Sequence, residues 1–218
     1  MKRTFFYKNS LSIIFILLFF LALMAQIYFG WRQHLAELEE YGKSDLSLWT
    51  YLSSGHFISA TFENFQSEFL QMGLYVILTI FLRQIGSAES KKIDEKEEVD
   101  REPIPHKKAP RPVRKGGWYL DIYKHSLSIA FILLFFISWA GHLYGSFLSF
   151  NEERIIQHKI PVHIIHFLKE PQFWFETFQN WQSEFLSVAS IVLLTIFLRQ
   201  KGSPESKPVD SPNLETGK

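Results

Sequence analysis

The stretch LSIIFILLFFLALMAQIYFGW, at residues 11–31, decides the fold class of this chain. A helix needs about 20 mainly apolar residues to cross a bilayer, and this stretch is long enough. A second stretch of the same kind, LSIAFILLFFISWAGHLYGSFL, lies at residues 127–148. Both stretches predict transmembrane helices.

Two shorter apolar runs complete the pattern, FLQMGLYVILTIFL at residues 69–82 and FLSVASIVLLTIFL at residues 185–198. Each follows a glutamate and precedes an arginine, and about 14 residues are too few for a full span. Counting back to residue 62 or 178 gives about 21 residues, or roughly 31 Å of helix. We therefore predict an all-α membrane protein with four transmembrane helices, at about residues 10–31, 62–83, 126–148 and 178–199.

The chain repeats itself at a fixed offset. FENFQSEFL at residues 62–70 corresponds to FQNWQSEFL at residues 178–186, and Tyr7 corresponds to Tyr123 at the same offset. Two crossings return the chain to its starting side, so both copies run in the same direction. The prediction is two parallel two-helix repeats related by a pseudo-two-fold axis along the membrane normal. The expected organisation is a first repeat, a linker, a second repeat and a tail, at residues 1–86, 87–117, 118–203 and 204–218.

Charge predicts the orientation of the chain and the nature of its linker. Lys and Arg concentrate in the N-terminus, the linker and the tail, which predicts that all three are cytoplasmic. The N-terminus resembles a signal peptide, but Leu23 stands where a small residue is needed and a matching segment recurs in mid-chain, so we expect an uncleaved anchor. The linker is acidic, then basic, and rich in proline, which predicts disorder. Its basic half either contacts anionic lipids or simply flanks the third span.

The repeated phrase carries polar residues into the apolar runs. Glu68 lies about 22 Å along the helix from Arg83, which places it below the outer edge of the hydrocarbon. Gln26, about 27 Å above Lys8, reaches a similar level. We predict an intramembrane polar cluster near the outer mouth of the bundle, with Glu68, Glu184, Gln26 and His142 facing its interior. The whole candidate set is Glu68, Glu184, Gln26, His142, Asn64, Asn180, Gln66 and Gln182.

Two interpretations of this cluster stay open. Ionisable side chains inside a membrane often mark an ion or substrate pathway, which would make the protein a small channel or transporter. Glutamates near a helix end also extend toward the interface, and polar faces also hold helices together. The second interpretation favours a structural or interaction role, in contact with the lipid bilayer and as a homo-oligomer or with an unknown membrane or cytoplasmic protein partner.

Several function classes lack support in the sequence. The chain has no cysteine, which excludes disulfides and thiolate metal sites, and its net charge of +1 gives no reason to expect nucleic acid as a partner. His158, His163 and His166 are spaced as in some zinc sites, but no cysteine or nearby carboxylate completes the set. No G-x-S-x-G, P-loop or HExxH motif is present, so we predict no metal, no cofactor and no enzymatic activity.

Six phrases carry a family resemblance: SGHF, FENFQSEFLQMG, FLRQIGSAESKKIDE, VRKGGWYL, NWQSEFL and FLRQKGSPESKPVD. They are similar to a bacterial family of short membrane proteins catalogued as domain of unknown function 6766, although the loop at residues 155–166 diverges. The resemblance covers nearly the whole chain. It implies a bacterial multi-pass membrane protein and no established activity. We expect this uncharacterised protein in the bacterial inner membrane.

Overall fold

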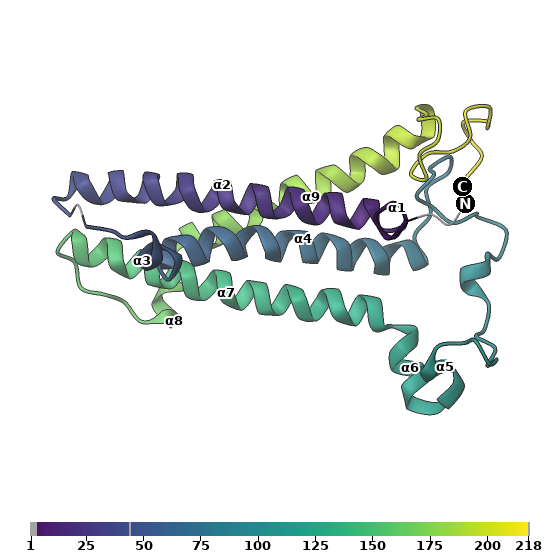
Figure 1. The fold of residues 1–218 in the computed structure, drawn as a ribbon, viewed down its shortest axis with the longest axis horizontal. Coiled ribbons are helices and arrows are strands. Elements are labelled where there is room, and N and C mark those ends of the chain that lie inside the picture. Colours follow the sequence, from purple (N-terminus) through teal and green to yellow (C-terminus); the bar gives the residue numbers. More distant parts are fainter. Residues whose placement is uncertain (1–3, 44, 218) are drawn as a thin grey trace. The chain divides into compact units, whose positions relative to one another are not determined.

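The computed structural model describes residues 4–43 and 45–217 of the chain. Within these residues the structure is helical and contains no strand, which confirms the predicted all-α class. Four long helices dominate, α2 (Ser10–Glu40), α4 (Gly55–Phe81), α7 (Ser126–Ile156) and α9 (Pro171–Phe197) (Figure 1). The short elements are α1 (Phe5–Lys8), α3 (Leu48–Leu52), η1 (Glu98–Asp100), α5 (Arg111–Lys115), α6 (Gly117–Lys124) and α8 (Ile164–Phe167).

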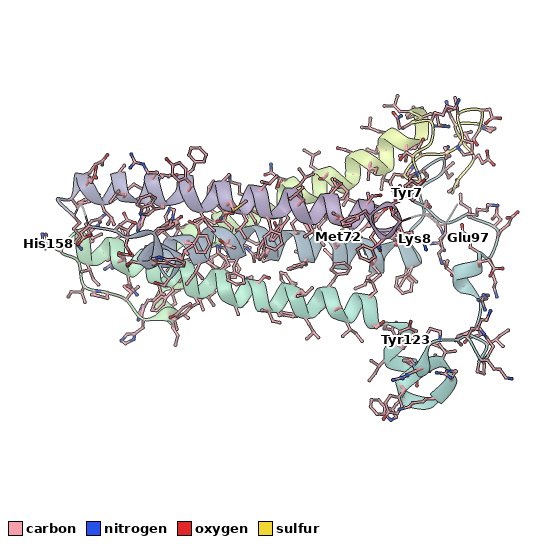
Figure 2. All side chains as sticks on the ribbon, in the orientation of Figure 1. Tyr7, Lys8, Met72, Glu97, Tyr123 and His158 are labelled. Atoms are coloured by element: carbon pink, nitrogen blue, oxygen red, sulfur yellow. The ribbon has the colours of Figure 1, made fainter. Side chains whose placement is uncertain are left out.

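Three of the described helices, α2, α7 and α9, are long and apolar enough to cross a membrane. Large apolar side chains are exposed along these three helices. Figure 2 draws the side chains on the ribbon, for example Met72 on α4. Helix α4 has the same length as α9, 27 residues, and the same polar phrase, but Gln71 and Tyr75 stand where α9 has Ser187 and Ile191, which lowers its hydropathy. The fourth predicted span therefore stays a prediction.

All four long helices continue seven to nine residues beyond one end of the predicted spans. The extension of α2 reads RQHLAELEE, which is rich in Ala, Leu and Glu, residues that favour helix without being apolar throughout. A span predicted from hydropathy ends where the apolar run ends, whereas the helix ends where the backbone is capped. The helices are therefore longer than the predicted spans, although the apolar segments themselves lie where the sequence places them.

The chain divides into two compact units. Unit 1 comprises Met1–Phe62 and Gly141–Glu170, and unit 2 comprises Glu63–Ala140 and Pro171–Lys218. The division passes through α4 and α7, so each of these helices contributes one part to each unit. Each unit is described separately below.

Helices α2 and α7 end in the same way within unit 1. After α2, Gly42 adopts a left-handed conformation (φ 75), and Lys43 N–H bonds to Leu38 O at 3.0 Å. After α7, His158 is left-handed (φ 56) and Lys159 N–H bonds to Arg154 O at 2.7 Å. This is the Schellman pattern of helix termination, in which glycine is the usual residue.

The linker in unit 2 departs from the expectation of a segment without structure. It contains η1, with a capping box between Glu97 and Asp100, and then the single turn of α5. A hydrogen bond from Lys91, and a second from the backbone N–H of Glu97, lower the pKa of Asp100 below its usual value. The linker sequence has no apolar periodicity, yet local polar contacts give this segment defined turns.

Candidate functional site

In unit 2, polar side chains of α4 and α9 bond to the facing helix. Gln71 Nε2 donates to Glu184 O at 3.3 Å. Asn180 Nδ2 donates to a carboxylate oxygen of Glu63 on α4, and also to Glu176 O at 2.9 Å in its own helix. Two members of the predicted cluster, Asn180 and Glu184, therefore take part in contacts between helices, but Glu184 does so through its backbone.

The polar side chains of the repeated phrase differ in how far they are buried. Gln66 is fully buried (0% exposed), whereas Glu68, Asn64 and Gln182 are exposed and Glu184 is half-buried. In both copies the serine of the phrase bonds to a carbonyl three residues back in its helix. In unit 2 the most enclosed polar side chain of the phrase is thus the glutamine Gln66 and not either glutamate.

The other two members of the predicted cluster lie in unit 1. Gln26 Nε2 donates to Thr61 Oγ1 at 3.2 Å, and the His142 side chain is fully buried (0% exposed). The glutamates belong to unit 2, so a common mouth formed by Gln26, His142, Glu68 and Glu184 stays a prediction.

A cavity of about 420 Å³ lies between the C-terminal halves of α4 and α9 in unit 2. Most of its walls are aliphatic, such as Leu78 and Val192, and its polar groups include Gln71, Tyr75 and Glu89. The Tyr75 hydroxyl donates to Glu89 Oε2, which ties the loop after α4 to the helix. This cavity is therefore mainly apolar, with a few polar side chains in its lining.

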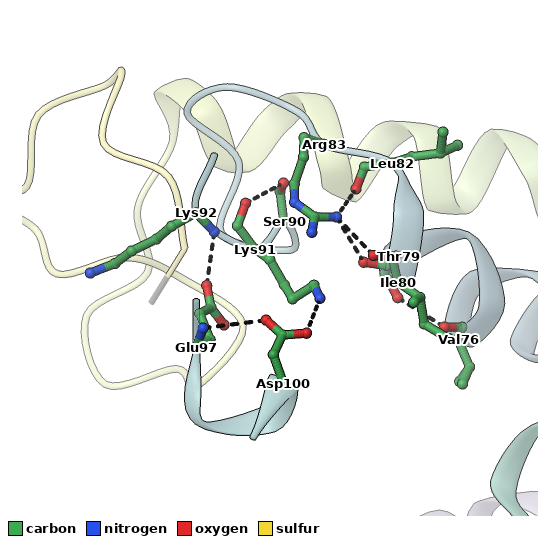
Figure 3. A network of polar contacts seen from close by, with 10 residues as sticks. All are labelled: Val76, Thr79, Ile80, Leu82, Arg83, Ser90, Lys91, Lys92, Glu97 and Asp100. Atoms are coloured by element: carbon green, nitrogen blue, oxygen red, sulfur yellow. Dashed lines mark hydrogen bonds and ion pairs between the residues drawn. The ribbon is translucent and has the colours of Figure 1, made fainter. Parts of the chain in front are cut away.

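The loops that follow α4 and α9 make matching hydrogen bonds, and we call them the cap loops (residues 82–91 and 198–207). In Figure 3 the Arg83 guanidinium points back to the carbonyls of Thr79, Ile80 and Leu82, at 3.4, 3.1 and 2.9 Å. Arg199 bonds to the corresponding three carbonyls of α9 at 3.1, 3.2 and 2.9 Å. A cation at a helix C-terminus also interacts favourably with the helix dipole.

The second cap loop places its lysine inside a ring of carbonyls. Lys207 is 2% exposed, and its Nζ donates to Gly86 O, Pro212 O, Asn213 O and Glu215 O at 2.5, 3.3, 2.9 and 2.7 Å. Burial, with a smaller effect of nearby Arg199, lowers the pKa of Lys207 below the usual lysine value. The lysine thereby holds the first cap loop and the tail together in unit 2.

Close backbone packing in unit 1 was missed by the sequence reasoning. A Cβ added at Gly145 of α7 would lie 2.3 Å from Ser59 N of α4, and one at Gly55 would lie 2.4 Å from Ser149 N. The Ser59 and Ser146 hydroxyls bond across the same contact at 2.6 Å. Small residues at four-residue spacing are the signal for this kind of packing in membrane helices, and Gly141 and Gly145 provide it in the sequence.

The three histidines whose spacing resembles a zinc site lie apart in the structure. His158, His163 and His166 are exposed and belong to no metal-type group in the described chain. Two other histidines, His34 and His56, stack in unit 1 with ring centroids 4.6 Å apart. No sequence motif links these two residues, because they lie on different helices.

An all-helical chain with three helices of membrane-spanning length and composition has the properties of a helical membrane protein. The chain belongs to the family described as Domain of unknown function (DUF6766), whose match covers residues 2–218. No curated protein and no solved structure matches it. The family description assigns no activity.

Proposed function

We propose that this chain is an integral protein of the bacterial inner membrane with a structural or interaction role. In this proposal α4 is a fourth span, and both termini and the linker are cytoplasmic. The concentration of Lys and Arg in those three segments supports the orientation. The partner is a second copy of the chain or another membrane or cytoplasmic protein.

The observation that carries the structural role is the use of polar side chains between helices. Gln71 and Asn180 reach from one helix to acceptors on the other in unit 2. In a bilayer such bonds hold helices together and contribute about 0.6 kcal/mol each on average, up to about 1.7. Side chains that bond to the protein in this way are not available to coordinate a moving ion.

The cap loops support an interaction role. Spanning a membrane requires only that the helix ends, yet each loop continues past its arginine with further hydrogen bonds, such as Gln84 N to Ser90 Oγ at 3.0 Å and Gln200 N to Ser206 Oγ at 2.9 Å. In the proposed orientation these ordered loops face the cytoplasm, where they present a fixed surface to a protein partner.

A small channel or transporter is the second candidate. Its support is the complete burial of two polar side chains, Gln66 and His142, within helices α4 and α7. In that case Glu68, Glu184, Gln26 and His142 would line a polar outer mouth.

Two double variants separate the candidates. We expect Gln71→Leu/Asn180→Leu to lower the thermal stability of the purified protein in detergent, because the interhelical bonds are lost. We expect Glu68→Gln/Glu184→Gln to leave proton flux unchanged, at the level of empty vesicles, in proteoliposomes with a pH-sensitive dye. Glu95→Gln/Glu98→Gln in the exposed linker is the matched control.

The opposite results decide against the structural role. Wild-type flux above that of empty vesicles that disappears in Glu68→Gln/Glu184→Gln, with folding retained, favours transport. Unchanged stability of Gln71→Leu/Asn180→Leu contradicts the role that we assign to the interhelical bonds.

A further inference from the structure

Three side chains of types that commonly bind metal ions lie together in unit 1, where α2 ends and α4 begins. His34 and Glu37 are three residues apart on one face of α2, and His56 is in the first turn of α4. One ligand atom of each side chain lies within 4.8 Å of those of the other two. His34 Nδ1 and Glu37 Oε2 are 3.4 Å apart.

One nitrogen of this group is buried without a hydrogen-bond partner. The His34 side chain is 9% exposed, and its Nε2 bonds to none of the described residues. A buried imidazole nitrogen without a partner is destabilising, and its presence calls for an explanation such as an ion. A metal ion supplies the missing partner through the lone pair of a neutral imidazole.

Tyr51 orients the second histidine. The buried Tyr51 hydroxyl lies 3.2 Å from His56 Nδ1, so the phenol oxygen can accept a hydrogen bond from Nδ1–H and leave Nε2 as a ligand. Helix α2 makes room for this phenol with a glycine, because a Cβ at Gly30 would lie 2.3 Å from the Tyr51 oxygen.

The surroundings favour a cation. A pocket of about 330 Å³ opens at this group, and its charged lining residues are Glu37, Glu40, Glu152 and Glu153. Neither lysine nor arginine is among the residues that line it.

The second copy of the repeated pattern shows that packing does not require these polar groups. The positions equivalent to His34 and Tyr51 are Phe150 and Phe167, whose rings contact each other with centroids 5.2 Å apart. The position equivalent to His56 is Gln172. In the second copy two phenylalanine rings fill the space that His34 and Tyr51 fill in the first copy. Because apolar rings are enough for packing there, the two imidazoles and the buried phenol of the first copy indicate a chemical role.

We propose that His34, Glu37 and His56 bind a divalent transition-metal ion, with Glu152 of α7 or water completing its coordination. Two imidazoles with carboxylate oxygen suit zinc and related ions. Bonds of about 2.0–2.2 Å from a tetrahedral zinc bring ligand atoms within about 3.5 Å of one another, so the side chains need to move by little more than 1 Å. The ion would connect α2 to α4.

Zinc binding to the purified, tag-free and chelator-treated full chain in detergent tests the proposal. We expect Zn²⁺ to bind with a dissociation constant of about 1 μM or tighter and to raise the unfolding temperature. His34→Phe and His56→Gln install the residues of the second copy and should weaken binding by more than about 100-fold. Tyr51→Phe should weaken it by about 10- to 100-fold, as is usual when a group that orients a ligand is lost.

The control removes three exposed histidines by the combined substitutions His158→Gly, His163→Ala and His166→Ala, and it should bind zinc as the wild type does. Failure of the wild type to bind, or equal loss in the control, overturns the proposal. A Co²⁺ spectrum of the wild type tests the ligand set even if a variant does not fold. Visible d–d bands are expected when cobalt binds, and their absence also overturns the proposal.

Discussion

A histidine ends α7 where a glycine ends α2. His158 and Gly42 are equivalent under the repeat offset, and both are left-handed, with φ 56 and φ 75. A residue with a Cβ is destabilised in this conformation by about 1–2 kcal/mol, whereas glycine is not. The same terminating geometry is therefore relaxed in one copy and strained in the other.

Exchanging the residue type should change stability in opposite directions at these two positions. We expect His158→Gly to stabilise the protein by about 1 kcal/mol and Gly42→Ala to destabilise it by a similar amount. Thermal unfolding in detergent, with metal ions removed by chelator, measures both. A loss of stability in His158→Gly would show that the histidine side chain makes a favourable contribution that outweighs the backbone strain.

Individual residues also show why the candidate site was predicted only in part. Asn180 and Glu184, two polar residues in or next to the apolar run of α9, take part in contacts between α4 and α9, whereas their place in an intramembrane cluster stays a prediction. Reasoning from the sequence missed His34 and His56, because the distance between two helices is not encoded in spacing along the chain. Their rings stack only after α2 and α4 are placed side by side in unit 1.

At the scale of helices, the contact between α4 and α7 depends on the absence of side chains. Gly145 allows the α4 backbone to approach so closely that a Cβ would lie 2.3 Å from Ser59 N. Gly73, elsewhere on α4, is different, because its nearest neighbour would be Phe131 Cβ at 3.4 Å, an ordinary contact. These two helical glycines should respond differently to the same substitution.

We expect Gly145→Ala to destabilise the protein by about 1–3 kcal/mol, because the backbones must move apart. Gly73→Ala should be neutral or stabilising by up to about 1 kcal/mol, because alanine favours helix. Both changes are measured by thermal unfolding of the purified protein. Equal effects of the two substitutions would contradict the close approach at Gly145.

Hydropathy predicted where the long helices lie but not where they end. The starts of α2 and α7 agree with the predicted spans at residues 10 and 126, since the apolar runs begin there. The other ends lie several residues further, and in α2 the residues beyond the span are rich in Ala, Leu and Glu, which continue a helix in water as well as in lipid. Capping by Gly42 and His158, not the loss of apolar character, ends α2 and α7.

At the scale of the whole chain, the proposed topology places the helix extensions and the proposed metal site outside the cytoplasm. The cap loops, linker and tail lie on the opposite side of the membrane in this proposal. The chain contains no cysteine, so a single introduced thiol reports on one position without background.

We expect Asp45→Cys to react with an impermeant maleimide on intact cells, because it follows α2. Lys96→Cys, in the exposed linker, should react only after the cells are permeabilised. Mass-tagged reagent and gel mobility measure both variants. Labelling of Lys96→Cys, but not of Asp45→Cys, on intact cells would reverse the orientation.

The cap loops have a consequence for protein engineering. Each arginine binds carbonyls at the end of its own helix, and some later bonds, such as Glu89 N to Ser87 Oγ and Glu205 N to Ser203 Oγ at 3.1 Å, join near neighbours in sequence. The first cap loop also bonds to distant parts of the chain, through Gly86 N to Thr216 Oγ1 at 2.9 Å and Lys207 Nζ to Gly86 O at 2.5 Å. A designer who appends the arginine segment alone to an unrelated transmembrane helix would therefore transfer the bonds to its last carbonyls, but not the geometry of the whole loop.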